Sequence, residues 1–243
     1  MSRYSRHRPL AVLAALGTCA AALTLAASLA GCDALGKLGT TGHYPAATSF
    51  TVDGRVTTVV IDAGSGSADV TASSRSTVAV SQQASYSTKP PVATHTLSGT
   101  TLTLSFSCAV ELTCGISYTV QVPRGVAVRV SAGAGSITLT SLSGAVSAQT
   151  GAGLITADDL QSASVSLKSD AGGIIATCSV PPRSLHASTN LGAITLSVPG
   201  SVAYKVSTHT FVGTSTVTVR RSSASPYAIS ASSDVGSVSI NPG

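Results

Sequence analysis

The sequence predicts an all-β fold, a parallel β-helix with coils of about 20 residues, and three observations support this. Only 9% of the 243 residues are charged and 4% are aromatic, so small and β-branched side chains that favour short strands dominate. Glycines recur at nearly constant spacing along the C-terminal half. Apolar residues alternate with other residues on both sides of these glycines.

The segment VRVSAGAGSITL, residues 128–139, shows the repeating unit. Val128 and Val130 stand two residues apart before Gly135, and Ile137 and Leu139 stand two apart after it. This alternation predicts two short strands, and glycine permits a tight backbone turn between them. The arrangement recurs with spacings typical of a solenoid at Gly135, Gly153, Gly172, Gly192, Gly213 and Gly236.

A third apolar column follows the second strand of the coils, and we expect it to consist of Leu142, Leu160, Val180 and Val198. Three inward columns per coil describe a β-helix in which each coil buries its core only against its neighbours. The differences in glycine spacing fall after this column, so insertions are expected at one corner of the solenoid.

The β-solenoid domain is expected to span residues 49–243, with regular coils over 124–243 and a less regular N-terminal β part over 49–123. The segment VVIDAGSGSADVT repeats the signature around Gly66, so the stack could begin there. Alternating runs on both sides of Ser98-Gly99 predict a hairpin. This part would cover the edge of the first coil, which would otherwise invite strand addition.

Residues 1–31 read as a lipoprotein signal peptide. Three arginines precede an apolar run over 10–30, and Leu29-Ala30-Gly31-Cys32 matches a lipobox, in which Cys32 would receive a diacylglycerol group. The alternatives are an ordinary signal peptide or an uncleaved membrane anchor. Residues 32–48 read as a flexible tether. The expected location is therefore the extracytoplasmic face of the cell membrane, with the lipid as membrane anchor.

Cysteine spacing agrees with export. Cys108 and Cys114 lie close together in SCAVELTCG and are expected to form a disulfide in an oxidising compartment; two free thiols are the alternative. Cys178 falls on a strand-like run and is expected to be a small buried residue.

The segment CGISYTVQVPRGVAVRVSAGAGSITLTSLSG, residues 114–144, together with the glycine coils and the lipobox, resembles the DUF4097 family of adhesin-like bacterial envelope proteins. The resemblance covers roughly residues 50–240. It implies a right-handed β-solenoid on the cell surface, and it carries no catalytic residues. The turns of this chain hold Ala134, Ala152 and Ala171, where relatives hold Asp or Asn, which argues against metal binding.

Other chemistry finds little support in the sequence. A phosphate loop needs a helix after its glycines, whereas SITLTSL after Gly135 is strand-like and no GK[ST] follows. No G-x-S-x-G elbow is present, and the histidines lack metal-ligand spacing. The net charge of +5 falls to +2 without Arg3, Arg6 and Arg8, so nucleic acid is not an expected partner. No cofactor or metal is expected.

Outward positions after the glycines are mostly Ser and Thr, but Leu154 and Ile175 interrupt this polar face in adjacent coils. They mark either a register irregularity or an apolar contact patch.

We expect a non-catalytic, lipid-anchored surface protein that binds an unknown envelope protein or cell-wall polymer. The alternatives are an accessory or sensor subunit of an envelope-stress system and a polysaccharide-acting enzyme, the latter disfavoured because carboxylates do not cluster.

Overall fold

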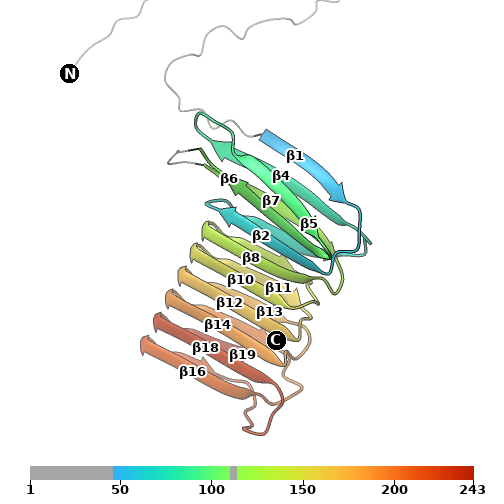
Figure 1. Cartoon of the computed structure of the whole chain (residues 1–243). Helices are drawn as coiled ribbons and strands as arrows, with labels where there is room; N and C mark the ends of the chain where they lie inside the picture. The colour runs from blue at the N-terminus through green and yellow to red at the C-terminus, as the bar shows by residue number, and fades with distance from the viewer. Residues whose placement is uncertain (1–45, 110–113) are drawn as a thin grey trace, which may run out of the picture. The chain divides into compact units, whose positions relative to one another are not determined.

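A computed structural model of the chain describes residues 46–109 and 114–243 (Figure 1). The predicted signal peptide, Cys32 and nearly all of the predicted tether lie outside these ranges. The described ranges contain strands and turns, and none of them holds a helix long and apolar enough to cross a bilayer. The fold of these residues is therefore all-β, as predicted.

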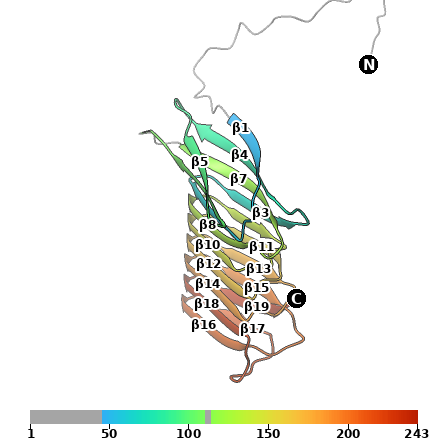
Figure 2. The same ribbon diagram turned by 45° about the vertical axis from the view of Figure 1, so that its right-hand side comes forward.

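The strands form two runs of neighbours that face each other across the core (Figures 1 and 2). In pairing order, the first run consists of β5 (Val92–Ser98), β6 (Thr101–Ser107), β2 (Thr58–Gly64), β8 (Ala127–Ala134), β10 (Val146–Ala152), β12 (Ser164–Ala171), β14 (Ser184–Leu191), β18 (Ala228–Val235) and β16 (Lys205–Val212). The second run consists of β1 (Ala46–Val52), β4 (Val78–Tyr86), β7 (Cys114–Pro123), β3 (Ala68–Ser73), β9 (Ile137–Thr140), β11 (Ile155–Leu160), β13 (Ile174–Cys178), β15 (Ile194–Val198), β19 (Val238–Pro242) and β17 (Ser215–Val217).

Each coil takes one strand from each run, and successive coils pair in parallel. Val146 of β10 pairs with Val128 of β8 and with Val165 of β12, so the apolar column predicted from the repeat is continuous. These side chains are buried because alternate residues of a strand point to the same face. The predicted stack of parallel coils is thus confirmed as a broadly β-solenoid fold.

The stack begins with β2 and β3, whose glycine is Gly66. These strands pair directly with β8 and β9, although residues 74–126 lie between them in the sequence. The intervening strands extend both runs beyond the first coil. The predicted hairpin is present as β5 and β6, with Gly99 at φ +59° in its turn. Strand β6 pairs with β2, and β7 pairs with β3, so both edges of the first coil are covered.

The predicted disulfide joins Cys108, just after β6, to Cys114 at the start of β7. It links the first run to the second at the end of the stack that β1 and β5 occupy. Cys178 is a free, buried thiol, as expected from its strand position.

The last two coils stack in the reverse of their chain order. The coil of β18 and β19 lies between the β14–β15 coil and the β16–β17 coil, which therefore ends the stack (Figure 1). The inward positions of β16 and β17 include Thr208, Thr210 and Ser215, whereas β18 and β19 bury Ala231 and Ile240. The more polar coil thus takes the end of the stack, where one side lacks a neighbouring coil.

The prediction for the third apolar column was wrong at one position. Leu142, Leu160 and Val198 are buried, but Val180 is 46% exposed and Cys178 takes its place, paired with Leu160. The column lies seven residues after Gly135 and Gly153 but six after Gly172 and Gly192. In the two coils with the seven-residue spacing, a non-glycine residue with positive φ, Ser141 or Asp159, directly precedes the column and takes up the extra residue.

Candidate functional site

The repeat glycines form a single column at one corner of the coils. In spatial order they are Gly66, Gly135, Gly153, Gly172, Gly192, Gly236 and Gly213. A Cβ on Gly192 would lie 2.3 Å from the carbonyl oxygen of Gly172, and the other members of the column from Gly135 onward meet the same obstacle. The amide of Gly172 donates to the Leu191 carbonyl of the next coil at 2.7 Å. The glycines therefore permit close stacking of backbone and present no ligand site.

A column of buried hydroxyls lies three residues before four of these glycines, and the sequence reasoning missed it. Each hydroxyl donates to the carbonyl of the glycine in the preceding coil over 2.8–3.1 Å. The donors are Thr150, Ser169, Thr189 and Ser233. A recurring [ST]-x-x-G spacing is the signal that would have found them. Because they are buried and bonded to backbone, they serve the corner and do not act as nucleophiles.

Leu154 directly precedes β11 and Ile175 lies in β13, and both side chains point outward from the second run of strands. Strand register is regular at Ile175, which pairs with Thr156 on one side and Thr195 on the other, whereas Leu154 lies in the turn just before β11. Their exposed fractions are 40% and 45%. A Cδ atom of Leu154 lies 3.3 Å from where a Cβ of Gly173 would be, so Leu154 covers bare backbone in the next coil. The two side chains form an apolar interruption of a Ser/Thr face, called the Leu154/Ile175 patch below.

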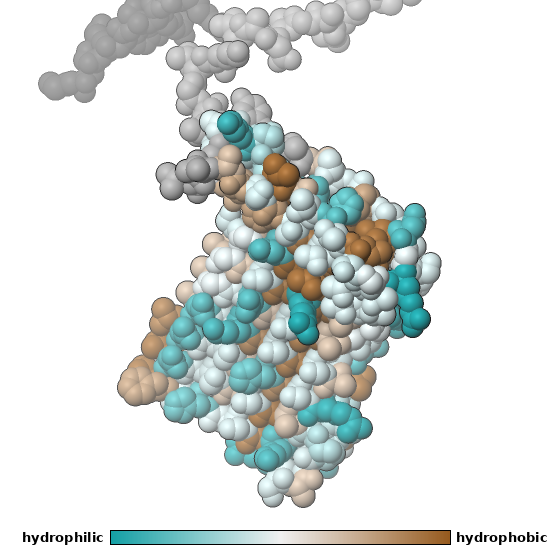
Figure 3. Space-filling model, viewed as in Figure 1, coloured by the Kyte–Doolittle hydropathy of each residue, from teal (hydrophilic) through white to brown (hydrophobic). Residues whose placement is uncertain are grey.

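The outward face of the first run carries a shallow polar hollow of about 270 Å³ across β8, β10 and β12. Gly133 and Gly151 leave the space, and the Lys168 ammonium lies 3.3 Å from the Asp170 carboxylate at its side. Hydrophilic residues lie along this face in Figure 3. Outward glycines in two successive coils are the sequence signal for the hollow, and the sequence reasoning did not use it.

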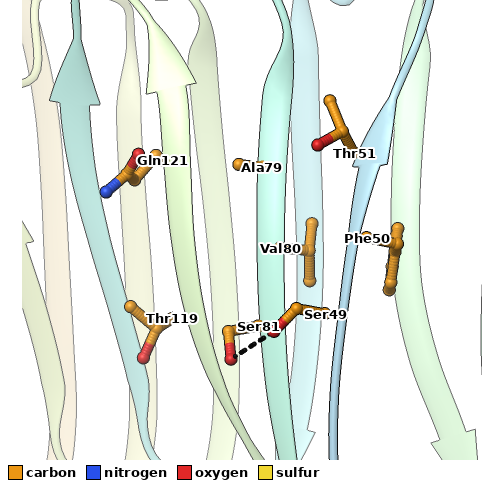
Figure 4. Close-up of a pocket in the computed structure, with 8 residues that line it drawn as sticks. All are labelled: Ser49, Phe50, Thr51, Ala79, Val80, Ser81, Thr119 and Gln121. Atoms are coloured by element: carbon orange, nitrogen blue, oxygen red, sulfur yellow. Dashed lines mark hydrogen bonds between the residues drawn. The ribbon is translucent and has the colours of Figure 1, made fainter.

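A second hollow of about 310 Å³ lies on the N-terminal part, over β1, β4 and β7 (Figure 4). The Ser49 hydroxyl donates to the Ser81 hydroxyl at 3.1 Å, and Thr119 and Gln121 project from β7. Its lining holds no ionisable side chain. It offers hydroxyl and amide hydrogen bonds but no acid, base or nucleophile pair.

The pKa shifts of Asp159 and Cys178 are caused by local hydrogen bonds and by burial. Hydrogen bonds from Ser179 and Ser141 lower the pKa of Asp159, whose carboxylate lies 2.8 Å from the Ser141 hydroxyl. Burial raises the pKa of the Cys178 thiol to about 11. Within residues 46–109 and 114–243, no three His, Cys, Asp or Glu side chains lie close enough to hold a metal ion.

Comparison with known proteins supports the fold. No family model matches the chain, and no curated protein matches it in sequence. A crystal structure from Clostridium sporogenes, provisionally named a cell adhesion protein, matches with a TM-score of 0.51 at 13% identity and covers 82% of this chain and 100% of that one. A Bacteroides fragilis protein, provisionally named an adhesin, matches with a TM-score of 0.49 at 13% identity, covering 83% of this chain and 98% of that one. At such identity the Clostridium likeness shows the fold alone.

Proposed function

We propose that this chain is a non-catalytic adhesion or envelope-interaction protein, held by a lipid on Cys32 at the extracytoplasmic face of the cell membrane. Its solenoid, right-handed as the family resemblance implies, presents a side face to an envelope protein or a cell-wall polymer. The contact surface is the Leu154/Ile175 patch with the hydroxyl side chains around it.

One observation carries the proposal: two large apolar side chains, Leu154 and Ile175, are exposed on adjacent coils of an otherwise hydroxyl-rich face. Burial of apolar surface in a complex stabilises it by about 25 cal/mol per Å². Exposed leucine and isoleucine on a face of polar side chains therefore favour a role as a contact surface. Thr138, Thr156 and Thr195 border them in the neighbouring coils. These hydroxyls can donate and accept hydrogen bonds around an apolar centre, the usual layout of a protein interface.

A binding role is also supported by how the polar residues are used. The buried hydroxyls donate to backbone, and Asp159 accepts from neighbouring serines. Acid catalysis on polysaccharide needs two carboxyl groups facing one bond, whereas the Asp170 carboxylate pairs with Lys168 on an exposed face. The provisional adhesion name of the Clostridium protein of the same fold agrees with this role.

The test compares cells that display the wild-type chain with cells that display Leu154→Ser/Ile175→Ser. We expect the double variant to lose capture of envelope material by in-cell crosslinking, with unchanged thermal unfolding. The matched control is Val92→Ser/Val180→Ser, which removes two other exposed apolar side chains, 63% and 46% exposed. Equal capture by the wild type and Leu154→Ser/Ile175→Ser would refute the contact surface.

The anchor is tested in the same cells with Cys32→Ser. We expect this variant to be shed into the medium or to keep its leader, because the thioether cannot form. Unaltered mature size together with unaltered membrane retention would refute lipidation at Cys32.

A further inference from the structure

The coil of β16 and β17 leaves an open strand edge at the end of the stack. Strand β16 pairs with β18 on one side, and no described strand pairs along its other side. Lys205 donates its amide to Tyr227 on the β18 side. Successive residues of a strand point their backbone groups to opposite edges, so Val206, Thr208 and Thr210 direct theirs to the open side.

This edge lacks the usual protection against pairing. Strand β16 is eight residues long and contains no proline, and its one formal charge, Lys205, stands at its start. Natural edge strands are normally shortened, charged, bulged or covered, because an open edge templates another strand. At the opposite end of the stack the antiparallel strands of the N-terminal part extend both runs, and β1 and β5 are the outermost strands there.

An exposed apolar ridge reaches the same end of the stack. Leu191, Val235 and Val212 pair in register at the ends of β14, β18 and β16, and they are 54%, 45% and 54% exposed. Phe211, next to Val212, is 81% exposed. Figure 3 shows apolar residues gathered where these strands end. The same column holds alanine in earlier coils, at Ala134, Ala152 and Ala171. The side chains of the column are therefore larger near the open end of the stack.

We propose that β16 is a self-association site, at which a second copy of this chain docks end to end by antiparallel pairing of the two β16 strands about a twofold axis at Thr208. The register follows because the backbone of Tyr204, just before β16, already has a partner: Tyr204 is bridged to Arg221 and its amide donates to the Arg220 carbonyl. The free window therefore runs from Lys205 to the end of β16 at Val212, and Thr208 is the edge-facing residue nearest its centre. Val206 then lies opposite Thr210 of the second copy.

Charge and shape complementarity select a second copy as the occupant. In this register Lys205 lies opposite Phe211 of the second copy, on the outward face, so its ammonium can pack against the aromatic ring. Asp234 stands beside Phe211, because Ser233 pairs with Thr210 and Val235 with Val212. Each basic start of β16 thus meets the apolar and acidic end of the other, and a twofold axis repeats the contact.

The same axis sets the end coil of one copy against the end coil of the other. It brings the exposed Arg220 and Arg221 of each copy toward the apolar ridge of the other. The first described strand, β1, lies at the opposite end of the stack from β16. The dimer itself does not depend on the lipid anchor of the proposed function.

The test uses the full chain, with its own leader, in bacterial cells oxidised with diamide. A Thr208→Cys variant places one thiol opposite its own copy at a Cα separation of about 5.5 Å, which a disulfide can bridge. We expect a disulfide-linked dimer several-fold above wild type. The matched control is Ser166→Cys, an exposed serine on β12, which is paired with a strand on each side, and it should stay at the wild-type level. A Thr208→Cys dimer no stronger than this control overturns the proposal.

A second pair of variants tests the register. Chains with Lys205→Cys and chains with Phe211→Cys, produced together, should crosslink to each other more than either does alone. Adding Thr208→Pro to both should abolish this, since proline removes an edge-facing amide and is compatible with an edge strand. Phe211→Ser in the Thr208→Cys chain weakens docking without touching the backbone. Crosslinking that ignores both changes overturns the proposal, while a result at the Leu154/Ile175 patch bears only on the proposed function.

Discussion

Replacing Gly192 with alanine should destabilise the solenoid far more than an alanine at an open glycine does. The new Cβ would lie 2.3 Å from the Gly172 carbonyl oxygen and 2.6 Å from its carbonyl carbon. Real Cβ contacts essentially never fall below 3.0 Å, so the two coils would have to separate by about 0.7 Å locally, which amounts to overpacking. The 2.7 Å hydrogen bond from Gly172 to Leu191 would lengthen with them.

Two costs add at this position. Alanine at the Gly192 φ of +147° occupies a backbone region that is essentially restricted to glycine, at about 1–3 kcal/mol. Overpacking against backbone adds about 1–3 kcal/mol. The expected loss in free energy of unfolding is therefore about 4 kcal/mol. For a domain of this size it corresponds to a fall in Tm of about 8–16 °C.

Gly99→Ala is the matched control, because it isolates the backbone cost. Gly99 has φ +59°, and nothing lies within 4 Å of where its Cβ would be, so the expected loss is about 1–2 kcal/mol. Both variants are compared by urea unfolding followed by circular dichroism. Equal losses for the two variants would refute the argument that close backbone stacking, and not the turn alone, requires the glycine column.

Two further predictions concern buried polar groups. Thr189→Val keeps the side-chain shape but removes the 2.8 Å hydrogen bond to the Gly172 carbonyl, so the free energy of unfolding should fall by about 1–2 kcal/mol. The control, Thr195→Val at an exposed position, should stay within about 0.5 kcal/mol of wild type. Similar urea midpoints for the two variants would contradict the role of the hydroxyl column. Burial raises the pKa of Cys178 to about 11 in the folded chain from an ordinary 9.0. The unfolded chain therefore loses this proton first, and stability should fall with rising pH between about pH 9 and pH 11, by up to about 1.4 kcal/mol per pH unit. Cys178→Ala should flatten this slope in urea titrations at several pH values, and an unchanged slope would assign the loss to other groups.

Much of the coil could be predicted because its determinants are local. Alternation at two-residue spacing placed Val128, Val130, Ile137 and Leu139 inward, and all four are buried. The same alternation placed Leu154 and Ile175 outward, where the structure has them. The hollow over Gly133 and Gly151 and the hydroxyl column were missed, because each arises from residues in different coils that meet only after stacking.

The third column shows the limit of counting along the chain. Leu160 and Cys178 occupy equivalent places although their distances from the preceding glycine differ by one residue. The left-handed backbone of Asp159 absorbs that residue, and a backbone angle of this kind is not visible in the apolar pattern. Val180 fits the pattern equally well and is left exposed.

The sequence by itself determined that the chain forms coils, where each coil turns, and which faces of its strands are buried. These properties follow from glycine spacing and side-chain alternation within one coil. Tertiary structure alone decided which coils are neighbours, because every coil offers the same strand register and chain order does not rank them. The apolar β18–β19 coil buries the most apolar surface when it has a neighbour on each side. The more polar β16–β17 coil loses the least apolar burial when it stands at the end. That competition, which no single repeat reveals, leaves β16 as the open edge.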